Sequence, residues 1–119
     1  MQTKLSIKNK KLKTSIIIKN NFISKFIKDI ANKNEKVFCI IDSKIKINLN
    51  FIKKNDIKII YIKCGEQIKT FDGYKDLTQK LIKNNINRKS VIVAVGGGTL
   101  GDLAGFVAST LLRGLDYFL

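Results

Sequence analysis

A cluster of glycines behind a run of β-branched residues is the part of the sequence that most clearly indicates chemistry. Four glycines, Gly96, Gly97, Gly98 and Gly101, follow the apolar run 91–95. Glycine lacks the Cβ atom that would block a close approach, and the first N–H groups of a helix have no partners within that helix. A turn of this composition between a strand and a helix is suited to a phosphate or diphosphate group. We therefore expect a nucleotide site at this turn.

The spacing of Gly96, Gly98 and Gly101 formally matches a dinucleotide-binding fingerprint, but the match is weak by itself. The turn follows a late strand, and Asp116 is a poor candidate for the acidic residue expected about 20 residues onward. Asp42, at the end of an upstream apolar run, offers another carboxylate. It could accept hydrogen bonds from a ribose diol, or it could cap a following helix. Spacing alone leaves both interpretations open.

A second polar pair, Glu66 and Lys69, follows the apolar run 57–62. Each side chain could bind a ligand, although a Glu and a Lys three residues apart are ordinarily a solvated pair at a helix entry. Asp42, this pair and the glycine turn all come at the carboxyl ends of predicted strands. Because open α/β sheets bind ligands at that edge, the coincidence favours a binding site.

The order of the apolar runs predicts an α/β fold with a Rossmann-like, open, mostly parallel sheet and flanking helices. The runs are short, rich in β-branched residues and separated by segments of helical length, which is the rhythm of βαβ units. They cover residues 16–18, 37–41, 57–62 and 91–95. Residues 4–7 and 14–18 can also pair as a hairpin, although the turn signal between them is weak.

Two helices are predicted in the first half of the chain. Apolar side chains at helical spacing predict a helix over residues 22–33, with Asn20 or Asn21 as its cap. A second helix is predicted over residues 45–54, with Ser43 as its cap, although its β-branched residues weaken the prediction.

The second half predicts a helix capped by Thr70 and another after the glycines. The segment 103–112 is apolar nearly all round, so we expect it to be buried on several sides. Residues 115–119 resemble the start of a further strand. Because little chain remains to bury the apolar helix, we expect a partner to cover it, either a second subunit or a missing downstream half.

The chain is strongly basic, with 23 Lys and Arg against 9 Asp and Glu and a net charge of +14. The lysines are scattered along every segment, and neither an aromatic platform nor an Arg-rich helix accompanies them. We therefore do not expect nucleic acid as a partner, whereas small anionic ligands are favoured.

Several classes of protein are not expected from the composition. The sequence has no histidine, and Cys39 and Cys64 lack CxxC spacing, so we expect reduced structural thiols and no metal site in this chain. No segment has the pattern of a signal peptide or a membrane span, so we expect a cytoplasmic protein without a membrane partner.

Four segments of the sequence together resemble the 3-dehydroquinate synthase family in their order and spacing. They are Gly65-Glu66-x-x-Lys69, Asn87-Arg88-Lys89-Ser90, the stretch from Gly96 to Phe106, and Arg113-Gly114. The resemblance covers residues 37–119, and Thr99 stands where the family usually has valine.

The resemblance implies an NAD-dependent lyase of the shikimate pathway, which leads to the aromatic amino acids. Members convert the phosphorylated sugar acid 3-deoxy-D-arabino-heptulosonate 7-phosphate into 3-dehydroquinate and phosphate. Residues 1–119 would then be a truncated NAD-binding α/β domain. The helical C-terminal domain, which holds a divalent metal (zinc or cobalt) and the substrate, would be absent. We therefore expect no turnover by this chain alone, and either a homodimer or a complementing C-terminal half as its partner.

Carried over position by position, the family pattern assigns a cofactor site and no catalytic residue to this chain. Asp42 would hold the adenosine ribose, and Asp102 would face the nicotinamide half of NAD. The residues that would line the rest of the NAD site are Gly65, Glu66, Lys69, Gly97, Gly98, Thr99, Leu100 and Gly101.

Arg113 matches the family arginine that reaches the substrate phosphate from the neighbouring subunit. Asp102 and Arg113 are 11 residues apart, which in one continuous helix would place them on nearly the same face but ~16 Å apart. Arg113 is therefore not expected to serve the site at the start of its own helix. An arginine that complements the helix dipole is equally consistent with the sequence.

Three alternatives share some of these features. Glycerol and iron-dependent alcohol dehydrogenases typically place Ala-Lys shortly after the aspartate, where this chain has Leu103-Ala104-Gly105-Phe106, so the synthase is favoured. Other sugar-phosphate cyclases are harder to separate, because their discriminating residues lie downstream. The last alternative is a non-catalytic basic remnant that binds polyanions.

Overall fold

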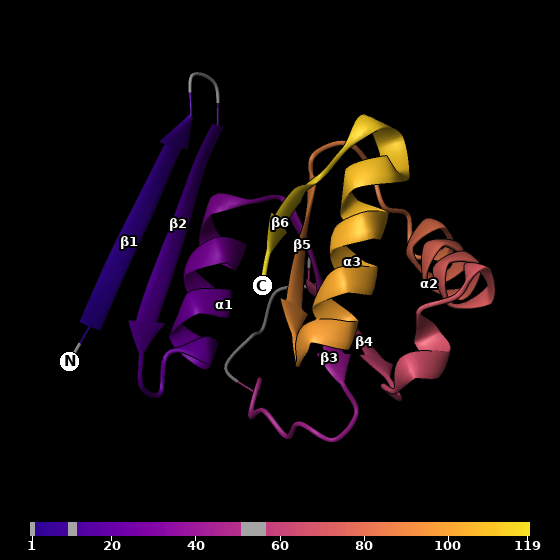
Figure 1. Cartoon of the computed structure of the whole chain (residues 1–119), viewed down its shortest axis with the longest axis horizontal. Helices are drawn as coiled ribbons and strands as arrows, with labels where there is room; N and C mark the ends of the chain where they lie inside the picture. Colours follow the sequence, from indigo (N-terminus) through magenta and orange to yellow (C-terminus); the bar gives the residue numbers. More distant parts are fainter. Residues whose placement is uncertain (1, 10–11, 51–56) are drawn as a thin grey trace.

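The computed structural model describes residues 2–9, 12–50 and 57–119. They form a four-stranded sheet flanked by helices, and a separate two-stranded hairpin (Figure 1). In chain order the elements are β1 (Gln2–Asn9), β2 (Leu12–Lys19), α1 (Ile23–Lys33), β3 (Lys36–Asp42), β4 (Ile57–Ile62), the 3₁₀ turn η1 (Glu66–Ile68), α2 (Phe71–Lys83), β5 (Ser90–Val95), α3 (Gly98–Thr110), the 3₁₀ turn η2 (Leu111–Arg113) and β6 (Asp116–Phe118).

The central sheet has four parallel strands in the order β4-β3-β5-β6. Ile40 of β3 lies opposite Ile60 of β4 and Ala94 of β5. Both inner strands are buried almost throughout, as expected where helices cover both faces of a parallel sheet. The predicted open parallel sheet is confirmed, including a last strand within residues 115–119.

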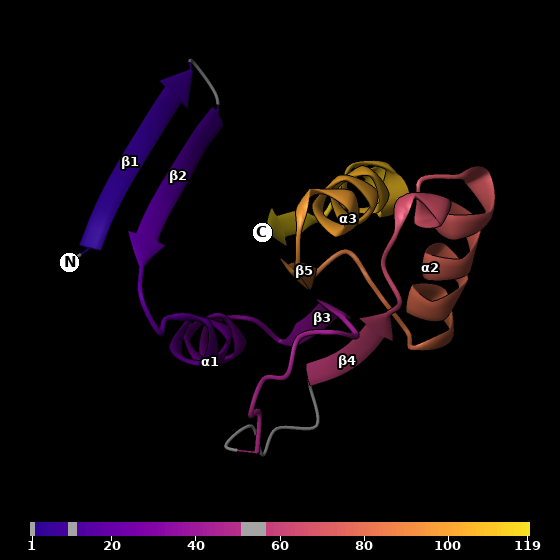
Figure 2. The ribbon, with the colours of Figure 1, turned by 60° about the horizontal axis from the view of Figure 1, so that its bottom comes forward.

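Helices cover the two faces of this sheet unequally (Figure 2). One face packs against α1, with Ile27 and Ile30 in contact with Cys39 and Val93 among others. The other face packs against α2 and α3 through a larger cluster. The buried members of that cluster are Phe38, Ile40, Ile60, Ile68, Leu77, Leu81, Ile92, Ala94, Leu100, Leu103, Ala104, Val107 and Ala108.

The predicted hairpin is confirmed as β1 and β2, which pair antiparallel with Leu5 opposite Ile16. In both views it lies beside α1 and away from the central sheet (Figures 1 and 2). Its apolar side chains are correspondingly exposed, namely Leu5, Ile7, Ile16, Ile17 and Ile18.

The helix predicted over residues 22–33 is confirmed as α1, but its predicted cap is wrong. Phe22 occupies the N-cap position and no side chain caps the helix. Asn21 has a φ of 51°, so it reverses the chain after β2 in the left-handed region that asparagine tolerates. The cap of α2 is as predicted, because Thr70 Oγ1 accepts a hydrogen bond from the N–H of Gly73 at 3.1 Å.

The helix predicted over residues 45–54 is wrong for residues 45–50, which are not helical, and residues 51–54 lie outside the described residues. Ile45, Ile47 and Leu49 pack against the α1 side of the core, whereas the intervening side chains are exposed. This alternation has the period of an extended chain, and the β-branched side chains favour it. Ser43 therefore caps no helix; its N–H donates to the carbonyl of Ile62.

The apolar helix α3 is buried largely by its own chain. It packs against β5, α2 and β6, and Tyr117 of β6 donates a hydrogen bond to the carbonyl of Gly101 at 2.8 Å. The expectation that too little chain remains to cover this helix is wrong, although Phe106 stays 57% exposed. None of the helices in the described part is long and apolar enough to cross a bilayer.

The two cysteines are free, as predicted, but their surroundings differ. Cys39 is fully buried in β3, and burial raises the pKa of its thiol to about 11. Cys64 is only partly buried, and its pKa is raised by burial and by the nearby Asp42 carboxylate.

We predict that a thiol reagent at pH 8 modifies Cys64 well before Cys39 in the folded chain. The thiolate is the reactive form, and Cys39 is both inaccessible and protonated at this pH. Ellman's reagent measures the two rates, and Cys39→Ala identifies the fast phase as that of Cys64. Equal rates for both thiols in the folded chain would contradict the burial of β3.

Candidate functional site

The glycine turn connects the carboxyl end of β5 to the start of α3. Gly97 is the N-cap residue in an extended conformation, and its carbonyl accepts the first helical hydrogen bond, from the N–H of Gly101 at 3.0 Å. No side chain caps this helix. The N–H groups of its first turn therefore have no helical partners and are available to an anion.

The four glycines of the turn have different reasons to be glycine. A Cβ atom added at Gly96 would lie 2.7 Å from Leu100 Cδ2, and one at Gly101 would lie 3.0 Å from the side chain of Leu119. Because Leu100 is buried, packing within the chain favours glycine at position 96, whereas at position 101 the exposed Leu119 side chain would have to shift.

At Gly97 and Gly98, by contrast, an added Cβ would meet no atom within 4 Å. Neither residue has a positive φ. Neither packing nor backbone conformation within the described chain requires glycine there. The two positions present bare backbone to open space, which is what a closely approaching ligand needs.

Asp42 lies beside this turn because β3 and β5 are neighbours in register, with Ile41 opposite Val95. Its Cβ is 3.4 Å from the position that a Cβ on Gly96 would occupy. Asp42 Oδ1 accepts a hydrogen bond from the N–H of Lys44 at 3.0 Å. Residues 43–50 form no helix, so the interpretation of Asp42 as a helix cap is wrong; its carboxylate stabilises a turn and also interacts with the Cys64 thiol.

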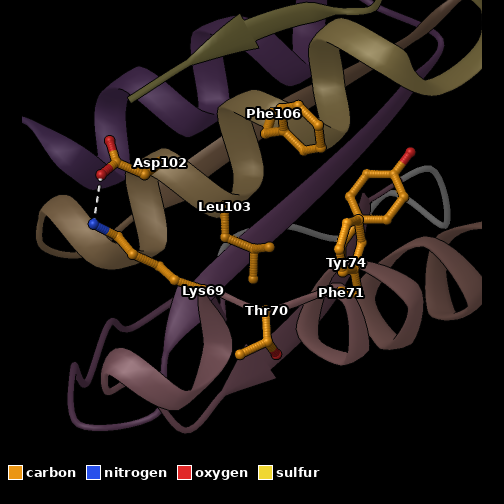
Figure 3. A pocket seen from close by; sticks show the side chains of 7 residues that line it. All are labelled: Lys69, Thr70, Phe71, Tyr74, Asp102, Leu103 and Phe106. Atoms are coloured by element: carbon orange, nitrogen blue, oxygen red, sulfur yellow. Dashed lines mark ion pairs between the residues drawn. The ribbon is translucent and has the colours of Figure 1, made fainter.

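The side chains of Glu66 and Lys69 each reach a residue of α3. Thr99 Oγ1 donates a long hydrogen bond of 3.4 Å to Glu66 Oε1. Lys69 Nζ pairs with Asp102 Oδ2 at 2.9 Å (Figure 3). That hydrogen bond and the negative charges of Asp102 and Glu66 raise the pKa of Lys69. The structure thus joins the predicted residues of η1 to the first turns of α3.

Two further predicted residues, Leu100 and Gly65, offer no side chain to a ligand. Leu100 is buried, so only its backbone is available to a ligand. Gly65 precedes η1 with an extended backbone, and a Cβ there would collide with the side-chain amide of Gln67.

A groove of about 370 Å³ between α2 and α3 adjoins the Lys69–Asp102 pair (Figure 3). Its walls include Phe71, Tyr74 and Phe106. The rings of Tyr74 and Phe106 meet edge to face, with centroids 5.2 Å apart, and Phe71 is 92% exposed. The helical spacing of Phe71, Tyr74, Leu77 and Leu81 predicts helix α2; Leu77 and Leu81 are buried, whereas Phe71 and Tyr74 line the groove. Phe71 directly follows the Thr70 cap. That position in the sequence indicates a side chain at the exposed start of a helix.

Arg113 lies away from this site, as predicted, but the geometry behind that prediction is wrong. Helix α3 ends at Thr110, and Leu112 and Arg113 have φ values of 51° and 70°. The two residues therefore do not continue the helix, and Arg113 shares no helix face with Asp102. It is exposed and precedes β6 at the amino end of the sheet.

A metal-binding cluster is not found in the described part of the chain, where no three His, Cys, Asp or Glu side chains gather. The groups present at this edge of the sheet are suited to the recognition of a ligand. Bare amides and the Lys69 ammonium suit a diphosphate, and the Asp42 carboxylate suits a hydroxyl donor.

Comparisons with known proteins show which family the chain is similar to. The family model described as "3-dehydroquinate synthase N-terminal" matches residues 59–119, just over half of the chain. A 3-dehydroquinate synthase from Staphylococcus haemolyticus is 36% identical over 110 residues, which cover 86% of this chain and 30% of that protein. One from Clostridium tetani is 42% identical over 89 residues, covering 71% of this chain and 24% of that protein. The chain thus spans about a third or less of the length of these relatives.

Solved structures show the same fold. A crystal structure of 2-deoxy-scyllo-inosose synthase, complexed with carbaglucose-6-phosphate, NAD+ and Co2+, superposes with a TM-score of 0.78 at 24% identity. The match covers 97% of this chain and 33% of that one. Taken with the family model, these similarities show that the chain belongs to the 3-dehydroquinate synthase family and corresponds to its amino-terminal part.

Proposed function

We propose that this chain is the NAD-binding part of a 3-dehydroquinate synthase. The complete reaction would convert 3-deoxy-D-arabino-heptulosonate 7-phosphate into 3-dehydroquinate and phosphate, a lyase step of the shikimate pathway. The observation that carries the proposal is the open space at Gly97 and Gly98, two glycines that the described chain does not itself require.

The residues around the turn fit a dinucleotide. The pyrophosphate would lie against the backbone of Gly97, Gly98 and Thr99, where the helix N-terminus favours negative charge. Leu100 would contribute its backbone only, because its side chain is buried. Gly101 would contribute close approach, because its N–H and carbonyl already bond to Gly97 and Tyr117.

The side chains around this cradle complete the proposed site. Asp42, whose carboxylate lies beside the glycine turn and also interacts with the Cys64 thiol, would accept hydrogen bonds from the adenosine ribose. Gly65, Glu66 and Lys69 would line the opposite side, and Asp102 would face the nicotinamide half.

NAD, when bound, supplies a reversible oxidation of a substrate alcohol. The contribution of this chain is to bind and orient the dinucleotide at the edge of the sheet. We assign no catalytic residue and no metal site to the described residues. The divalent metal of the proposed reaction would belong to the part of the family that this chain does not span.

The proposed partners follow from the same assignment. Arg113 is exposed at the amino end of the sheet, whereas the glycine turn lies at the carboxyl end. We propose that it contacts the substrate phosphate in a neighbouring subunit, within a homodimer or a complex with a complementing C-terminal half, in the cytoplasm.

Gly98 is the position at which a substitution tests the glycine turn. Gly98→Val should weaken NAD binding by at least about tenfold, since a branched side chain would displace the pyrophosphate from several amides. Isothermal titration calorimetry of the 119-residue chain measures the dissociation constant. Gly98→Ala is the graded control and should give a smaller loss. Stability should change little, because the added atoms meet open space. Equal NAD affinity in wild type and Gly98→Val would exclude this turn as the diphosphate site.

Asp42 has a structural role in its turn and a proposed role in binding the ribose, and one substitution separates them. Asn at this position keeps an oxygen that can accept from the Lys44 N–H but loses the charge that favours ribose hydroxyls. We expect Asp42→Asn to weaken NAD binding by about fivefold to tenfold while the urea midpoint stays near the wild-type value. If the variant instead lost stability and kept its affinity, Asp42 would be a structural residue only.

A further inference from the structure

The ion pair between Lys69 and Asp102 lies at the edge of the proposed diphosphate site. Asp102 is four residues after Gly98 in α3, so the two residues are on the same side of the helix. Helical side chains lean toward the N-terminus of their helix, which brings the Asp102 carboxylate toward the glycine turn. Its observed partner, Lys69 Nζ at 2.9 Å, comes from the segment between η1 and α2.

Three carboxylates near the turn have the wrong sign for a diphosphate, those of Asp42, Glu66 and Asp102. Lys44 supplies a positive charge beside Asp42. Lys69 supplies one beside the first turns of α3, where Asp102 holds it. A diphosphate that enters the turn therefore meets the Asp102 carboxylate as a like charge and competes with it for the lysine.

The Lys69–Asp102 pair can also open, so that the lysine can pair with another anion. Both side chains are partly solvated, with 40% of Lys69 and 69% of Asp102 exposed, and exposed ion pairs are weak. The backbone of Lys69 is fixed, since its N–H donates to the carbonyl of Glu66 at 3.1 Å and the next residue caps α2. The four-carbon side chain of Lys69 can therefore change rotamer while its backbone stays in place.

We propose that Lys69 is a partner-exchange residue, which pairs with Asp102 in the ligand-free chain and transfers to the diphosphate of a bound ligand. Asp102 then acts against diphosphate binding by holding the lysine and by its own charge. This inference rests on the proposed function and concerns the same site.

The test uses ADP as the ligand, because ADP carries the adenosine and the diphosphate but no nicotinamide half that could contact Asp102. Asp102→Asn should bind ADP about two- to fivefold more tightly than wild type, a range set by the strength of exposed ion pairs. Lys69→Met should bind it more weakly. Asp116→Asn is the matched control, since it removes the same charge at the amino end of the sheet and should leave the affinity nearly unchanged.

Calorimetric titration of these four proteins and of Gly98→Val with ADP separates the outcomes. If Asp102→Asn bound ADP with the affinity of Asp116→Asn, or more weakly than wild type, Asp102 would not oppose the diphosphate and the exchange would be overturned. If Gly98→Val bound ADP as well as wild type, or if wild type bound none, the proposed site itself would fail. The exchange would fall with it.

Discussion

The parallel pairing of β3 with β5 is the constraint on which the proposed site depends. With Ile41 opposite Val95, the two strands end at the same level, so that Asp42 comes to lie beside Gly96. Pairing of β3 with β4 brings the following segment, η1, to the same edge. A shift of one residue in either register would exchange the side chains between the two covered faces of the sheet and disrupt both clusters. The buried core therefore fixes the positions of the polar groups.

Much of this arrangement could be predicted from sequence because it follows from local rules. The β-branched runs predict the strands, and Thr70 before an amphipathic segment predicts the start of α2. The helix predicted over residues 45–54 is wrong for 45–50, because apolar and polar residues alternate there with the period of a strand. The prediction that too little chain remains to bury α3 is wrong for another reason. Which surface a helix packs against is decided by long-range contacts, here with Tyr117 and Leu119, that no local pattern contains.

The glycine turn shows the same limit at the level of single residues. The sequence presents four glycines with one apparent purpose, whereas the structure divides them by what surrounds each position. Gly96 and Gly101 permit close packing, and Gly97 and Gly98 leave backbone exposed. Likewise, the contacts of Glu66 with Thr99 and of Lys69 with Asp102 join residues 33 positions apart in the chain. Sequence alone identified these residues as candidates but gave no indication that they pair.

The central claim is that the bare backbone of Gly97 and Gly98 binds the diphosphate of NAD. Its most direct test is a titration of the ¹⁵N-labelled chain with NAD, followed by the amide resonances in heteronuclear NMR spectra. The account predicts that the amides of Gly97, Gly98 and Thr99 shift most, while those of the hairpin β1–β2 stay unchanged. Saturating NAD that left the three amides unperturbed, or that shifted another surface of the chain instead, would contradict it.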